Sequence, residues 1–110
     1  CNTTISPKSM IIYNVTISIH PEIEKEALAW LKDEHIPEVI STNLFTEHHM
    51  YKVVENHIDR THNSYAIQYH MESWEKFDEY TKNYADDLRQ KTIDKYGENL
   101  LAFRTFLEKF

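Results

Sequence analysis

The sequence predicts an α+β domain in which two helices cover one face of a four-stranded antiparallel sheet. Four segments are typical of strands, because they are rich in β-branched and aromatic residues. Two longer segments carry apolar residues at helical spacing, and the order is strand, helix, strand, strand, helix, strand. This is the ferredoxin-like βαββαβ arrangement, a two-layer sandwich in which right-handed crossovers place the first and third strands in the middle of the sheet.

The first strand is expected at residues 10–19. Every second residue from Ile11 to Ile19 is apolar, and Asn14, Thr16 and Ser18 lie between them. Because successive side chains of a strand point to opposite faces, the apolar row faces the core and the polar row faces away from it.

The first helix is expected to begin at Pro21 and to end near His35. Proline is tolerated in the first turn of a helix, and the acidic residues that follow suit its positive end. Pro37 disfavours the helical conformation for the residue before it, so 38–43 should form a short helical or irregular connection. The stripe that this helix should bury is Ile23, Ala27, Trp30 and Leu31.

Residues 45–54 and 65–71 are expected to form a hairpin of the second and third strands. In 65–71 aromatic and apolar residues alternate with polar ones, which is typical of a half-buried strand. The segment 45–54 alternates less cleanly, and its charged residues and histidines indicate an edge strand.

The second helix is predicted from an N-cap at Ser73 to about Tyr96, followed by the last strand at 100–107. Gly97, the one glycine of the chain, stands where a helix C-terminus favours a positive φ. The stripe that this helix should bury is Trp74, Phe77, Tyr84 and Leu88.

The composition excludes several classes of function. At 110 residues and 13.2 kDa the chain is one domain. A formal net charge of −6 with scattered basic residues argues against nucleic acid as a partner. No apolar run approaches the ~20 residues of a membrane span, and the one cysteine cannot form an internal disulfide. A Gly-rich phosphate loop is excluded by the lone glycine, and we expect no cofactor.

Residues 1–9 are polar and aperiodic, so we expect a flexible tail before a folded domain at 10–110. The expected location is the cytoplasm. The alternative is a protein anchored to a membrane by a lipid on Cys1, with the polar residues after it as a tether.

The sheet face without helices is where we expect the function. Its predicted residues are Ile12, Asn14, Thr16, Ser18, Gln68, His70, Ala102, Arg104 and Phe106. Apolar side chains such as Ile12, Met50 and Phe106 are costly to expose together, so a second copy of the chain is expected to cover this face in a homodimer. Polar side chains enclosed there need hydrogen-bond partners across the dimer or on a ligand. The ligand-binding candidates are therefore Asn14, Gln68, His70 and Arg104.

Two roles are open for Arg104. Its guanidinium can bind a ligand carboxylate through paired hydrogen bonds, or it can pair with an acid such as Glu47 at the dimer seam.

The histidines of the predicted hairpin raise the question of a metal. His48 lies opposite His70 in one register, and His49 does so when the register shifts by one residue. Two imidazoles need a third ligand, and the domain offers no cysteine. Edge histidines at a dimer contact are the alternative, and the sequence by itself predicts no bound metal.

Several segments of the chain carry a resemblance to one family. They are 10–16, 30–39, 45–47, 66–69, 96–97 and 102–105, in the right order. Together they resemble domain of unknown function 4286, a family of small bacterial proteins, over residues 10–108. The resemblance implies a ferredoxin-like chain related in architecture to the dimeric α/β barrels. It implies no reaction, because the family has no assigned activity.

We expect a homodimeric module that binds or senses a small molecule. One alternative is a cofactor-independent monooxygenase or isomerase of the dimeric α/β barrel type, working in a cavity between helices and sheet with Asn14, Trp30 or Trp74 and a nearby histidine. The simpler interpretation of both tryptophans is that they are core residues without a role in catalysis. A second alternative is a structural interaction module.

Overall fold

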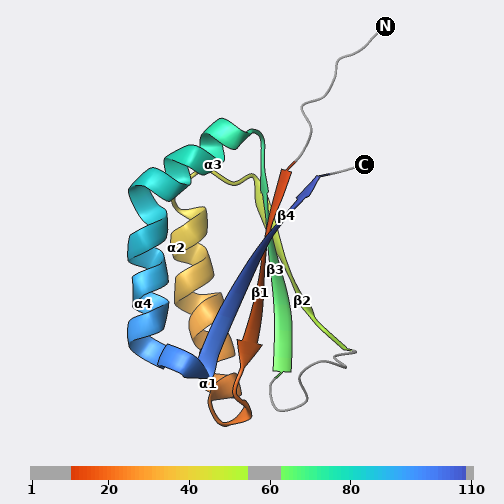
Figure 1. The fold of residues 1–110 in the computed structure, drawn as a ribbon, viewed down its shortest axis with the longest axis vertical. Coiled ribbons are helices and arrows are strands. Elements are labelled where there is room, and N and C mark those ends of the chain that lie inside the picture. The colour runs from red at the N-terminus through yellow and green to blue at the C-terminus, as the bar shows by residue number, and fades with distance from the viewer. Residues whose placement is uncertain (1–10, 55–62, 109–110) are drawn as a thin grey trace, which may run out of the picture.

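The computed structural model describes residues 11–54 and 63–108, and it confirms the predicted element order. Four strands form one antiparallel sheet in the order β2-β3-β1-β4. Figure 1 shows both helical runs on one side of this sheet, and no described segment covers the other side. The strand bounds are β1 (Ile11–Ile19), β2 (Glu47–Lys52), β3 (Asn63–Met71) and β4 (Leu100–Glu108). The predicted tail at residues 1–9 lies outside the described residues.

The first helical run is longer than predicted. It passes without a break through η2 (Pro21–Ile23), α1 (Glu24–Trp30), η3 (Leu31–His35) and α2 (Ile36–Ile40). The predicted end near His35 is therefore wrong. In the π-helical turn η3 the Ile36 N–H donates to the carbonyl of Leu31, five residues earlier. This wider turn comes directly before Pro37, which lacks an N–H and whose ring would clash with the carbonyl four residues earlier in a regular helix.

The second helical run, α3 (Trp74–Tyr80), η4 (Thr81–Ala85) and α4 (Asp86–Tyr96), follows the predicted bounds. The hydroxyl of Ser73 accepts from the backbone N–H of Lys76 at 3.3 Å, which confirms the N-cap. Gly97 confirms the helix end, because its φ is +57° and its N–H donates to the Ile93 carbonyl.

The predicted stripe of this run is only partly right. Leu88 is buried and Phe77 is half-buried, but Trp74 and Tyr84 are exposed. The turn η4 is π-helical and contains more residues per turn than an α-helix, so the buried position moves from Tyr84 to Ala85.

The core lies between the helices and the apolar row of β1, as predicted. Tyr13 is its centre near α3, with a side chain only 5% exposed. Five aromatic rings have centroids 5.0 to 6.4 Å from the Tyr13 ring, namely Phe45, Tyr69, Phe77, Tyr80 and Phe106. Such ring pairs add to the free energy of area burial, so this cluster anchors the helices to the sheet.

The register of β4 corrects the predicted faces of the sheet. Ala102, Arg104 and Phe106 pair with apolar core residues of β1 and lie on the helix-covered face, not on the open face. Because β4 has apolar residues on both faces, the alternation of its sequence alone did not show which set of alternate residues faces the helices. Leu100 decides the parity, because it pairs with Ile19 at the buried end of β1.

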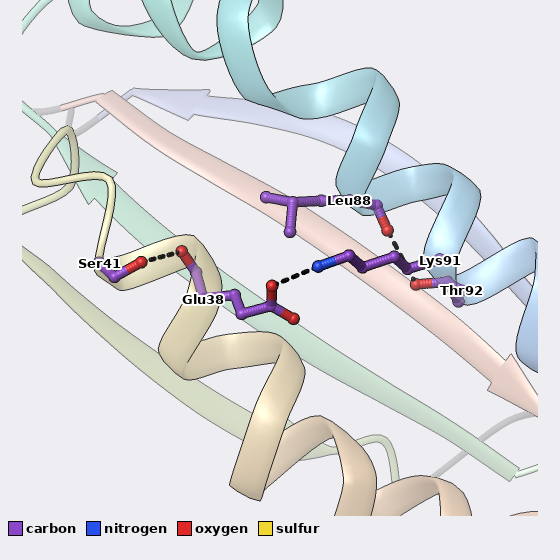
Figure 2. A network of polar contacts seen from close by, with 5 residues as sticks. All are labelled: Glu38, Ser41, Leu88, Lys91 and Thr92. Atoms are coloured by element: carbon purple, nitrogen blue, oxygen red, sulfur yellow. Dashed lines mark hydrogen bonds and ion pairs between the residues drawn. The ribbon is translucent and has the colours of Figure 1, made fainter.

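An ion pair joins the two helical runs. Lys91 Nζ of α4 lies 2.6 Å from Glu38 Oε2 of α2, and Figure 2 shows the two side chains meeting between the helices. The hydrogen bond and the charge of Glu38 raise the pKa of Lys91. The pair thus links the helices on the side of the layer opposite the sheet's open face.

Candidate functional site

A cavity of about 230 Å³ lies between the sheet and the helices. Its floor is the helix-facing side of β1, β3 and β4, and its walls come from both helical runs. Most of the lining is aliphatic, including Val15, Ile67, Val39 and Leu88. A small apolar cavity with a few convergent polar groups is the usual form of a ligand site.

The charged groups of this cavity have one sign. Arg89 and Arg104 line it, and none of the described lining residues is an aspartate or a glutamate. This contrasts with the formal net charge of −6 for the whole chain. Such a cavity favours a ligand with an anionic group and an apolar body.

Arg104 lines the cavity beside the aromatic cluster around Tyr13. Its Nε donates to the hydroxyl of Tyr13 at 2.9 Å, which orients the guanidinium over the aromatic cluster. The residue lines the cavity and is exposed, and no other side-chain hydrogen bond of its guanidinium is found among the described residues. The prediction that Arg104 lies on the open face is therefore wrong. The residue lies on the opposite face of the sheet from the other three predicted ligand residues.

Two buried tyrosines, Tyr69 and Tyr80, line the same cavity. Burial raises the pKa of Tyr69 and that of Tyr80 well above the ordinary value. For Tyr80 the charges of Arg104 and Arg89 act in the opposite direction, so both guanidinium groups lie within electrostatic reach of its hydroxyl. The two phenols therefore stay protonated at neutral pH and serve as hydrogen-bond donors.

His35 is the residue that sequence reasoning missed most clearly. Its Nδ1 is buried with no hydrogen-bond partner in the described part of the chain, and the side chain lines the cavity. Burial lowers the pKa of His35, so the imidazole is neutral at pH 7. The spacing of four from Leu31 to His35 and from His35 to Val39 was the available signal, because it puts the imidazole in the middle of the buried stripe.

Both π-helical turns border the cavity. Leu31 and His35 belong to η3, and Ala85 belongs to η4. A π turn rotates the residues that follow it relative to an α-helix, and such turns are frequent at functional sites. Here they direct an imidazole and a small side chain toward the same space.

The open face holds the other predicted ligand residues. Asn14, Gln68 and His70 all lie there, and Asn14 pairs directly with Gln68 across β1 and β3. Asn14 Nδ2 also donates to Thr16 Oγ1 at 3.1 Å on the same strand. Neither tryptophan lies on this face, because Trp30 and Trp74 belong to the helical layer, where Trp30 is half-buried and Trp74 exposed. The predicted group of Asn14 and a tryptophan is thus not brought together.

The apolar part of the open face is only partly as predicted, because Ile12 lies there, opposite His70 and Leu107, but the other two residues do not. Met50 lies on the helix side, opposite Ile67, and Phe106 lies there too. In their place the open face carries Leu101, Phe103, Leu107 and Tyr51, whose exposed fractions are 38% to 58%.

The hairpin histidines are arranged in neither of the two predicted registers. His48 pairs with Tyr69 and faces the helix side. Glu47 pairs with His70 on the open face, and His49 follows two residues later on the same face. The ring centroids of His49 and His70 are 5.3 Å apart. The predicted pair His48 and His70 is therefore replaced by His49, His70 and a carboxylate.

Two solved structures share the fold. One is an ethyl tert-butyl ether d (ethd) family protein from Bacillus halodurans, with a TM-score of 0.68, 9% identity, and coverage of 91% of this chain and 99% of that one. The other is described as a dimeric ferredoxin-like protein from an uncultured marine organism, with a TM-score of 0.51, 9% identity, and coverage of 92% and 95%. At this identity the likeness concerns the fold alone.

The sequence was also compared with curated proteins and with protein-family models. No match to the sequence is found among curated proteins. Among the described residues, no helix has the length and apolar character that crossing a membrane requires. A family model matches residues 10–110, nearly the whole chain, and the protein therefore belongs to the family Domain of unknown function (DUF4286).

Proposed function

We propose that this protein binds a small anionic molecule with an apolar body in the cavity between its helices and its sheet. The observation that carries the proposal is the charge pattern of the lining: two guanidinium groups, a neutral imidazole, and no carboxylate among the described residues. Arg104 is the anchor for the anion, because its fork matches a carboxylate with two parallel hydrogen bonds.

The size of the cavity limits the ligand. About 230 Å³ is below the usual range for drug-sized ligands, so the apolar body is one or two rings or a short aliphatic chain. The neutral phenols of Tyr69 and Tyr80 and the imidazole of His35 offer hydrogen bonds to a second polar group of the ligand. A hydroxy- or oxo-substituted aromatic carboxylate meets all these conditions.

Binding of a model ligand tests the proposal. The probe is 1-naphthoate, with the neutral 1-naphthamide as its isosteric partner, and binding is followed by calorimetry. We expect naphthoate to bind more tightly than naphthamide, and Arg104→Gln to weaken naphthoate about tenfold, since a charge-assisted hydrogen bond is lost. Lys25→Gln on the exposed face of α1 is the control and leaves the affinity unchanged. Equal affinity for the acid and the amide in the parent protein would refute the anionic site.

The active form is proposed to be a homodimer in the cytoplasm, with the open sheet faces together. Apolar residues on an otherwise uncovered face support this, and one structural neighbour is described as dimeric. Light scattering should give twice the chain mass of 13.2 kDa. Phe103→Glu, on the open face, should shift the mass toward one chain, whereas Tyr84→Glu, on the helical layer, should not. A single-chain mass for the parent protein at micromolar concentration refutes the dimer.

A second candidate function is deprotonation of a bound quinol or a related acid before its reaction with oxygen or its isomerisation. It is favoured by the unpartnered, neutral imidazole of His35 in the same cavity as the cationic anchor. Oxygen uptake with a naphthoquinol substrate is the assay. A rate lost in His35→Gln but kept in Asn14→Ala supports this candidate, and the reverse pattern would instead support an active site on the open face.

A further inference from the structure

We propose that Glu47, His49 and His70 bind a divalent transition-metal ion on the open face of the sheet. This site is separate from the helix-side cavity, since the three side chains lie on the opposite face. Its test is therefore independent of the proposed ligand.

The backbone ladder of the hairpin brings the three donors together. Glu47 and His70 are direct cross-strand partners in β2 and β3, and His49 lies on the same face two residues after Glu47. His49 Nε2 lies 2.6 Å from Glu47 Oε2, and the two imidazole rings meet at 68° with centroids 5.3 Å apart. One donor atom of each residue lies within 4.8 Å of the other two.

Little movement is needed to close this group around an ion. With metal–ligand distances of about 2.1 Å, tetrahedral ligands stand about 3.4 Å apart. Glu47 and His49 are exposed and His70 is half-buried, so small rotations of χ angles meet this requirement without disturbing the core. The strand backbone holds the Cα atoms in place, which reduces the ordering that binding would otherwise require.

The chemistry of the donors indicates the class of metal. Two imidazoles and one carboxylate form a set typical of zinc, nickel, copper or non-haem iron sites, whereas magnesium and calcium prefer oxygen donors alone. The Glu47 carboxylate supplies an anionic oxygen donor, and the two imidazoles supply one nitrogen donor each. Three protein ligands leave at least one coordination position open to water or to a small ligand.

His48 provides a matched control for the test. It is adjacent to both Glu47 and His49 in sequence, it belongs to the same strand, and it faces the opposite side. The chain has seven histidines, so weak background binding of metal is expected and a difference between single variants is the informative quantity.

The experiment is competition of the intact protein with a chromophoric chelator for Zn²⁺ at pH 7.5, together with the visible spectrum of the Co²⁺ form. We expect one tight equivalent per chain. His49→Ala and His70→Ala should each weaken that equivalent about tenfold or more and change the Co²⁺ spectrum, while His48→Ala should change neither. Glu47→Gln keeps the shape but removes the charge, and it should also weaken binding.

Circular dichroism of each variant confirms that it is folded, which is expected because Glu47, His48 and His49 are exposed and His70 is only half-buried. Zn²⁺ affinity that falls equally in His48→Ala and His49→Ala overturns the proposal. So does affinity that is unchanged in both His49→Ala and His70→Ala, because the ion then binds elsewhere on the chain.

Discussion

Replacing His35 with phenylalanine should remove an acid-sensitive element from the fold. The imidazole is half-buried, its buried Nδ1 has no partner in the described part of the chain, and its ring stacks on Trp30 with centroids 5.1 Å apart. Phenylalanine keeps the stacked ring and removes the unpaired polar atom. An unsatisfied buried polar atom costs about 1–3 kcal/mol, so we expect His35→Phe to be about 1 kcal/mol more stable than the parent at pH 7.

The pH dependence follows from the direction of the pKa change. Burial lowers the pKa of His35 in the folded protein below the ordinary histidine value of 6.5, while the charges of Glu38 and Lys91 oppose each other. The unfolded chain therefore binds more protons than the folded one below about pH 6.5. Protonation of His35 therefore does not lower the free energy of unfolding above this pH. As the pH decreases below it, the free energy of unfolding falls by at most about 1.4 kcal/mol per pH unit.

The assay is urea unfolding of parent and variant between pH 5 and pH 8, followed by tryptophan fluorescence. The advantage of His35→Phe in the free energy of unfolding should grow from pH 8 to pH 5. His48→Phe, at an exposed position, controls for the loss of a histidine. Parallel curves for parent and His35→Phe across this range would show that the imidazole is not buried in its neutral form.

The remaining predictions concern the core, one backbone position and one partly buried hydrogen bond between β3 and α1. Tyr13→Ala should cost about 3–5 kcal/mol in urea unfolding, because it removes the central ring of the aromatic cluster, and Tyr13→Phe should cost far less. Gly97→Ala should cost about 1–3 kcal/mol, entirely from its positive φ, since an added Cβ meets nothing within 4 Å; equal stability would contradict the strain. Burial and the hydrogen bond to Glu24 raise the pKa of Tyr65 to about 12, so Glu24→Gln should move this pKa part of the way toward 10 in a spectrophotometric titration. An unchanged titration would mean that burial alone sets the value.

The element order and the central strand could be predicted from the sequence because both depend on local pattern. The alternation from Ile11 to Ile19, the N-cap at Ser73 and the lone Gly97 are signals that do not depend on distant residues. They were enough to predict a ferredoxin-like domain, and the segments that resemble the family predicted a likeness over residues 10–108, which the family match over residues 10–110 confirms.

The functional sites could not be predicted in the same way, because they depend on contacts between segments that are far apart in the sequence. β4 is apolar on both faces, so its pairing with β1 decided that Arg104 joins Tyr13 beneath the helices and not Asn14 on the open face. Two π-helical turns shifted the buried residues of the helices. The hairpin register then chose His49 over His48 as the neighbour of His70. A shift of one residue moves a side chain to the other face of a sheet, and only the packed tertiary structure fixes that shift.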